Sequence, residues 1–151
     1  MRNINLALLS WFGSGYSPKA PGTAGSLAAL PFAWVISSYF GATGLVIAAI
    51  LITLVGWAAA AATEEAKKDP GWVVIDEVAG QWLTLSIVPP DIILYIIGFL
   101  AFRFFDILKP WPIRTLEQRI RGALGVMVDD IAAAVYAGMV LYAAAQLIGA
   151  S

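Results

Sequence analysis

Long apolar runs separated by short polar segments make up most of this chain. The run at residues 44–62 has nineteen residues without a charge, about enough for a helix that crosses the roughly 30 Å hydrocarbon core of a bilayer. The pattern predicts an all-α integral membrane helical bundle of about four to five membrane segments. The apolar runs are residues 24–40, 44–62, 72–88, 92–102 and 131–148.

Glycine and proline mark the ends of these runs. A turn is expected at residues 41–43, and Pro110 and Pro112 are expected to stop the fourth helix. Residues 13–26 contain four Gly and two Pro, which predicts a structured loop. Thr23 or Ser26 is expected to cap the helix that follows this loop.

Composition supports the membrane assignment. The chain has 151 residues, of which 60% are hydrophobic and 13% charged, so we expect one membrane domain over residues 1–151. It has no Cys and no His. This excludes disulfides, thiolate metal sites and covalent phosphocysteine or phosphohistidine intermediates. Any chemistry must use carboxylates, Lys, Arg, hydroxyl groups and the backbone.

The charges are strongly segregated along the sequence. No charged residue lies between Lys19 and Glu64, and none follows Asp130. If the five runs alternate across a membrane, all nine Lys and Arg fall on one side, which the positive-inside rule makes cytoplasmic. We therefore expect a polar site that faces the cytoplasm. No basic patch indicates a nucleic-acid partner.

Two acidic pairs are candidates for metal binding. Asp76 and Glu77 interrupt an apolar run, where ionisable groups are costly and usually functional. Asp129 and Asp130 are expected to open the last helix, where they could alternatively serve as a cap. Carboxylate oxygens select Mg²⁺ or Mn²⁺, which neutralise a phosphate and activate a water molecule.

Basic residues and the Gly-rich loop are candidates for phosphate binding. Arg103 and Asp106 share a helix face, so they could also form a simple ion pair or, with Lys109, snorkel at a membrane boundary. The loop resembles an anion cradle but lacks the Gly-Lys-Ser/Thr ending of a nucleotide-binding loop. The candidate phosphate ligands are Lys19, Thr23, Ser26, Arg103, Lys109 and Arg114.

Two other classes of function remain as alternatives. A small transporter or lipid-binding membrane protein could recognise phosphate without hydrolysing it, although charges on one face alone argue against a transport pathway. A transferase that joins a lipid head group to an alcohol would need a donor site, for which the sequence has no pattern.

Four blocks, in order along nearly the whole chain, resemble the phosphatidylglycerophosphatase A family. They are residues 13–26, 76–82 (Asp-Glu-Val-Ala-Gly-Gln-Trp), 103–114 and 122–130. The resemblance implies a magnesium-dependent enzyme of the bacterial inner membrane that hydrolyses the terminal phosphate of phosphatidylglycerophosphate to give phosphatidylglycerol. Ile75 stands where family members can carry Trp.

The resemblance also assigns roles to residues. It makes Asp76, Glu77, Asp129 and Asp130 the expected Mg²⁺ ligands, with Asp106 as a further catalytic carboxylate beside Arg103 and Lys109 at the phosphate. The expected partners are the lipid substrate and the bilayer. The number of metal ions, the identity of the general base and association with a second copy of the chain stay open.

Overall fold

The computed structural model describes residues 2–68, 70–120 and 122–149, and within these ranges every regular element is helical. This confirms the all-α prediction. Asp69 and Arg121, which the charge pattern includes, lie outside the described residues. The helices are α1 (Arg2–Leu9), α2 (Pro21–Ala61), α3 (Ile75–Leu85), α4 (Ile92–Leu108), α5 (Ile113–Arg119) and α6 (Ala123–Leu147), with short 3₁₀ helices at Ser14–Tyr16 and Ala66–Lys68.

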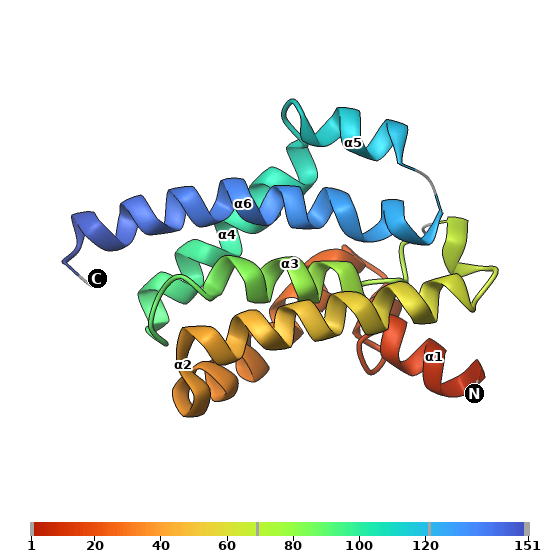
Figure 1. The fold of residues 1–151 in the computed structure, drawn as a ribbon, viewed down its shortest axis with the longest axis horizontal. Helices are drawn as coiled ribbons and strands as arrows, with labels where there is room; N and C mark the ends of the chain where they lie inside the picture. The colour runs from red at the N-terminus through yellow and green to blue at the C-terminus, as the bar shows by residue number, and fades with distance from the viewer. Residues whose placement is uncertain (1, 69, 121, 150–151) are drawn as a thin grey trace.

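α2 is a helical hairpin, because Gly41 breaks it with φ 67° and ψ −167°. Residues 21–40 run to one end of the molecule and residues 42–61 return alongside α3 (Figure 1). This confirms the turn expected at residues 41–43. Each half has about 20 residues and is therefore about 30 Å long, the thickness of a bilayer core.

The start of α2 differs from the sequence prediction. The helix begins at Pro21, and its N-cap residue is Ala20, which makes no side-chain capping hydrogen bond. Thr23 and Ser26 both lie inside the helix, so the prediction that either one caps it is wrong. Proline suits the first helical position because its φ is already helical and its missing N–H is not needed there.

α3 lies in the centre of the bundle, between α2 and α6 and beside α4 (Figure 1). It has 11 residues, nine of them buried, and is about 16 Å long, roughly half the thickness of a bilayer core. By length, then, the third expected segment does not cross a bilayer as a helix. The indole N–H of Trp82 donates to the Ala29 carbonyl (3.0 Å), which ties α3 to the first half of α2.

Gly80 allows α3 to approach two other helices closely. A Cβ at this position would lie 2.6 Å from the Phe102 ring of α4 and 3.0 Å from the Asp130 carbonyl oxygen of α6. Any side chain here would force these helices apart, and with them the polar residues at the start of α3 and in α6.

α6 begins earlier than expected, at Ala123 after the N-cap residue Gly122. Asp129 and Asp130 therefore lie in the second turn of α6, and the prediction that they open or cap the helix is wrong. The influence of the helix dipole fades after the first turn, so these carboxylates need another source of stabilisation.

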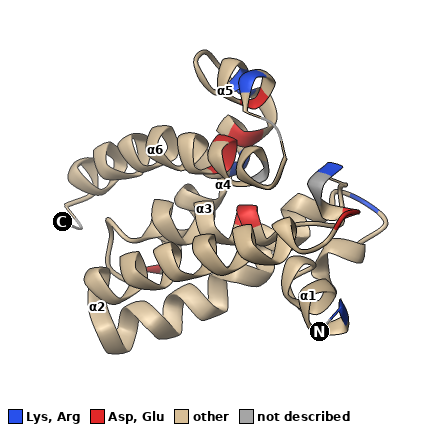
Figure 2. Cartoon of the chain, turned by 45° about the vertical axis from the view of Figure 1, so that its right-hand side comes forward, with Lys and Arg blue, Asp and Glu red and all other residues tan. Residues whose placement is uncertain are grey.

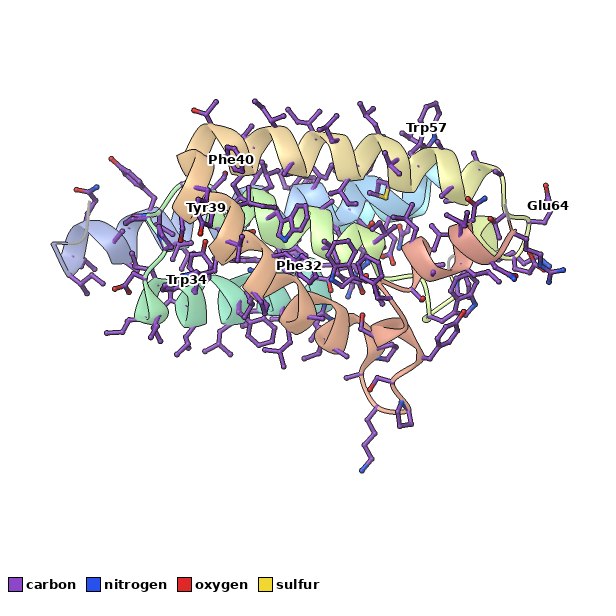
Figure 3. All side chains as sticks on the ribbon, turned by 90° about the horizontal axis from the view of Figure 1, so that it is seen from below. Phe32, Trp34, Tyr39, Phe40, Trp57 and Glu64 are labelled. Carbon is purple, nitrogen blue, oxygen red and sulfur yellow. The ribbon has the colours of Figure 1, made fainter. Side chains whose placement is uncertain are left out.

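Two helices, α2 and α6, are long and apolar enough to cross a membrane. Tyr39, Phe40 and Trp57 of α2 are exposed, and Figure 3 shows Tyr39 and Phe40 near the hairpin turn and Glu64 at the opposite end. Charged residues gather mainly at the end of the bundle that carries α1, α5 and the start of α6 (Figure 2). This one-sided distribution agrees with the segregation seen in the sequence.

Candidate functional site

A polar cavity of about 280 Å³ lies where α2 and α3 begin, α4 ends and the early turns of α6 pass. Blocks that are far apart in sequence meet at this cavity. The first turns of α2 and α3 lie there beside the C-terminal end of α4 and the early turns of α6. The lining residues are Ala20, Pro21, Gly22, Gly71, Val73, Asp76, Glu77, Arg103, Asp106, Lys109, Asp129 and Asp130.

Arg103 holds one side of the cavity together. Its Nη1 lies 2.6 Å from Asp106 Oδ2 and 3.8 Å from Glu77 Oε1, so the ion pair expected from the three-residue spacing is present. Nη1 also donates to the hydroxyl of the buried Ser26 (3.5 Å). Arg103 therefore links α4 to the early turns of α2 and α3, and it is one of the residues that line the cavity.

Lys109 borders the other side, at the C-terminal cap of α4. Its ammonium group forms ion pairs with Asp129 of α6 and with Glu117 of α5, the latter at 3.0 Å. Burial alone would lower the pKa of the Lys109 ammonium, but these two carboxylates outweigh it and raise that pKa. Lys109 stays a cation at physiological pH. Its backbone is left-handed (φ 45°), a costly conformation that is found more often at functional sites.

Asp130 is the least accessible carboxylate of the cavity, with 2% of its surface exposed. Its Oδ2 accepts no hydrogen bond from any part of the chain that the structure describes, and the same holds for Oε2 of Glu77. A buried carboxylate oxygen without a donor costs several kcal/mol unless a cation compensates it. Both residues line the cavity, where a bound cation would compensate these oxygens.

The carboxylates form two groups with metal-ligand spacing. Asp76, Glu77 and Asp130 make one group, Asp106, Asp129 and Asp130 make the other, and within each group the ligand oxygens lie within 4.8 Å of one another. Asp130 belongs to both groups. The four predicted ligands thus lie together, but the pairing differs from the prediction, because Asp106 completes the second group.

Electrostatics favour divalent cations in this cavity. Five carboxylates and two cationic side chains line it, so with all of them ionised the net charge is −5 + 2 = −3. A phosphate dianion would be repelled by such a site. Oxygen ligands at this spacing suit Mg²⁺ or Mn²⁺, which would reverse the repulsion.

The other predicted phosphate ligands do not border the cavity. Ser26 lies behind Arg103, as described, and Thr23 is half-buried in α2. Lys19 and Arg114 are exposed, and neither is among the lining residues. A phosphate role for these four residues stays a prediction.

Gly22 is a residue of the site that the sequence showed only as part of a Gly-rich loop. A Cβ here would collide with Glu77 Oε1 and lie 3.0 Å from Arg103 Nη2. The absence of a side chain is therefore what lets the carboxylate and the guanidinium meet over the first turn of α2.

We expect Gly22→Ala to lower the turnover rate by at least about tenfold, because a displaced Glu77 or Arg103 loses its alignment with the other cavity groups. Steady-state kinetics of the purified variant measure this effect. Leu27→Ala, at an exposed position on the same helix, is the control and should keep the wild-type rate. Equal rates for Gly22→Ala and the control would contradict the packing argument.

Gln81 is a second residue that sequence reasoning did not single out. It is fully buried one turn after Glu77 on α3, and neither its amide nitrogen nor its amide oxygen has a hydrogen-bond partner in residues 2–68, 70–120 and 122–149. Its signals in the sequence were its place in the block 76–82 and its polarity inside an apolar run.

Comparison with known proteins adds an independent finding. The profile of the family described as Phosphatidylglycerophosphatase A matches residues 7–145. The chain is 39% identical over 134 residues to the Escherichia coli protein named Phosphatidylglycerophosphatase A, covering 87% of this chain and 77% of that protein. The Haemophilus influenzae protein of the same name is 38% identical over 135 residues, covering 87% of this chain and 83% of its own length.

A third relative carries a different name. A Bacteroides thetaiotaomicron protein, provisionally named a phosphatidylinositol-3-phosphatase, is 39% identical over 148 residues and covers 91% of each chain. No solved structure matches this chain. All five cavity carboxylates, with Arg103 and Lys109, lie within the residues that the family profile matches.

Proposed function

This chain belongs to the phosphatidylglycerophosphatase A family, and we propose that it is a magnesium-dependent lipid phosphatase that hydrolyses the terminal phosphomonoester of phosphatidylglycerophosphate. One observation supports the chemistry above all. Five carboxylates and two cations from three helices line a single cavity, and the two groups of carboxylates share the buried Asp130. That arrangement suits divalent cations and a phosphate together.

The carboxylates would hold the metal. Asp76, Glu77 and Asp130 form one ligand group, and Asp106 and Asp129 complete a second group with Asp130. Bound Mg²⁺ supplies charge neutralisation of the phosphate and lowers the pKa of a water molecule. A neighbouring carboxylate would accept the proton of the attacking water, whose oxygen bonds to phosphorus as the bond from phosphorus to the lipid oxygen breaks. The proton would then pass to the leaving lipid oxygen, which departs as the free hydroxyl of the lipid product.

Arg103 and Lys109 would bind the phosphoryl oxygens. Without substrate each is paired with a carboxylate, Arg103 with Asp106 and Lys109 with Asp129. These pairs keep the two cations ordered at the cavity wall, so little reorganisation is needed when the phosphate arrives. As charge shifts to the leaving oxygen, the same cations stabilise the phosphoryl group.

We propose that the two halves of α2, together with α4 and α6, surround α3 in a bacterial cytoplasmic membrane. Two helices with suitable length and apolarity, and exposed aromatic side chains on α2, support this placement. The polar cavity would face the cytoplasm, because the basic residues gather at its end of the bundle. The lipid head group would enter from that side.

The direct test is release of inorganic phosphate from phosphatidylglycerophosphate by the purified protein in detergent. We expect turnover with Mg²⁺ and essentially none after chelation with EDTA, because carboxylates outnumber cationic side chains in the cavity by five to two and a metal is needed to bring a phosphate among them. Adding Mg²⁺ or Mn²⁺ back should restore the rate. Full activity in EDTA would contradict the metal requirement.

The same assay tests a second lipid phosphomonoester. The name of the Bacteroides relative gives phosphatidylinositol 3-phosphate as the alternative substrate. We expect phosphatidylglycerophosphate to be hydrolysed faster, and the reverse order would assign this chain to the other activity. No phosphate release from any lipid would favour a transporter or lipid-binding protein.

A further inference from the structure

An apolar groove lies along α6, on the C-terminal side of Asp130. Its wider part has a volume of about 430 Å³ and lies between α3 and α6, and a second part of about 220 Å³ lies where α3 and α6 meet the returning half of α2. Leu83 borders both parts, so they are neighbours along one surface. The mechanism proposed above uses neither part.

The groove begins beside the carboxylates along both helices. On α6, Ile131 of the smaller part directly follows Asp130, and Ala134, Gly138 and Tyr142 of the wider part lie further along the helix. On α3, Ala79 lies one turn after Asp76 and Leu83 lies one turn beyond it, while Ile87 lies just past the end of the helix. At about 100° per residue, the groove occupies the side of α6 next to the face that carries Asp130. The groove therefore extends along the helix axes from the level of the polar site.

The length of the groove matches one leaflet of a bilayer. Its lining on α6 extends from Ile131 to Tyr142, which at 1.5 Å per residue is about 16 Å. Half of a hydrocarbon core of roughly 30 Å is about 15 Å. A lipid whose phosphate lies in the cavity would have its hydrocarbon at this depth.

We propose that the groove binds one acyl chain of the lipid substrate, so that the chain is held between α3 and α6 while the phosphate lies among the carboxylates. This inference rests on the proposed function. Gly138 is the residue that keeps the groove open, because a Cβ there would have only Ile87 Cδ1 nearby, at 3.7 Å. A small side chain fits at this position without disturbing the helices, whereas a large one fills the groove.

The test compares long and short acyl chains in one variant. Gly138→Trp should raise KM for dioleoyl phosphatidylglycerophosphate by at least about tenfold, which corresponds to about two methylene groups that are no longer buried. Its kcat and KM for the water-soluble dihexanoyl lipid should stay within about twofold of wild type. The matched control Val140→Trp adds the same side chain at an exposed position outside the groove. It should leave kcat and KM unchanged for both lipids.

The outcomes separate the groove from the proposed function. If wild type hydrolyses neither lipid, the proposed function fails, and the groove proposal fails with it. If wild type hydrolyses both lipids and Gly138→Trp affects them equally, the groove proposal alone is overturned.

A second measurement uses the wild-type protein, so that the proposal can be tested even if Gly138→Trp does not fold. Phosphatidylglycerol with a diazirine in its acyl chain should crosslink wild type in nanodiscs mainly to α3 and α6 residues of the groove, as mapped by mass spectrometry. Crosslinks spread evenly over the outer face of α2 would show ordinary lipid solvation and overturn the proposal. Absence of label from the groove residues would also overturn the proposal.

Discussion

Replacing Asp130 by Asn is expected to reduce turnover by a factor on the order of 10³ or more, because one substitution removes a ligand from both carboxylate groups. The amide keeps the shape of the side chain but cannot supply the negative charge. Phosphate release at saturating Mg²⁺ measures the loss. Titration with Mn²⁺, followed by electron paramagnetic resonance, should show weaker binding than in wild type at every site to which Asp130 contributes.

The thermal stability of Asp130→Asn provides a second check, because the substitution is expected to abolish activity without lowering the stability of the metal-free protein. Without metal, Asp130 is a buried carboxylate beside three or more others, and a neutral amide relieves that repulsion. We therefore expect the melting temperature in EDTA to equal or exceed that of wild type, while the rise caused by Mg²⁺ should shrink. Asp91→Asn is the matched control, because Asn also caps a helix and Asp91 caps the N-terminal end of α4, opposite the end at Lys109 that borders the cavity. An active Asp130→Asn enzyme would refute the metal assignment.

Arg103→Lys is expected to lower kcat by about 10² to 10³-fold although it preserves the charge. Nη1 of Arg103 contacts Asp106, Ser26 and Glu77, and Nε is buried, so Nη2 is the nitrogen that we expect to donate to a phosphate. A lysine ammonium cannot hold these partners and present a second donor in a fixed direction. Steady-state kinetics with the dihexanoyl lipid measure the change without interference from acyl-chain packing.

The control for this variant is Arg119→Lys, at an exposed position in the last turn of α5. It makes the same chemical change at the same end of the bundle and should retain the wild-type rate. Circular dichroism and the melting temperature should show that Arg103→Lys still folds, since its ion pair with Asp106 can re-form through the ammonium. If kcat stays unchanged, Arg103 has only a structural role.

The sequence predicted the helical class and most of the polar cluster because both depend on local patterns. Gly41 between two charge-free runs was enough to place the hairpin turn, and the recurring blocks contain every charged residue of the cavity. Acidic pairs within apolar runs stand out because burial of a charge is costly. Seven of the expected site residues meet in one cavity as a result.

What the sequence could not show depends on packing between helices. The apolar run 72–88 has the composition of a spanning helix, yet α3 is a short central helix, and periodicity cannot distinguish the two. The position of Asp129 and Asp130 in α6 depends on a start at Ala123, ahead of the charge-free run 131–148 from which the last helix was predicted. The grouping of Asp106 with Asp130 requires the close approach at Gly80, which no linear spacing reveals.

The hairpin of α2 has a consequence for how such a chain enters a membrane. Its two halves are joined through Gly41 with no polar loop, and Tyr39 and Phe40 are exposed beside the turn. In the proposed orientation, the first forty inserted residues would carry no charged group to the far side of the bilayer. The hairpin can therefore insert as one unit, and a protease added outside the cell would find almost no backbone to cut in the hairpin turn itself.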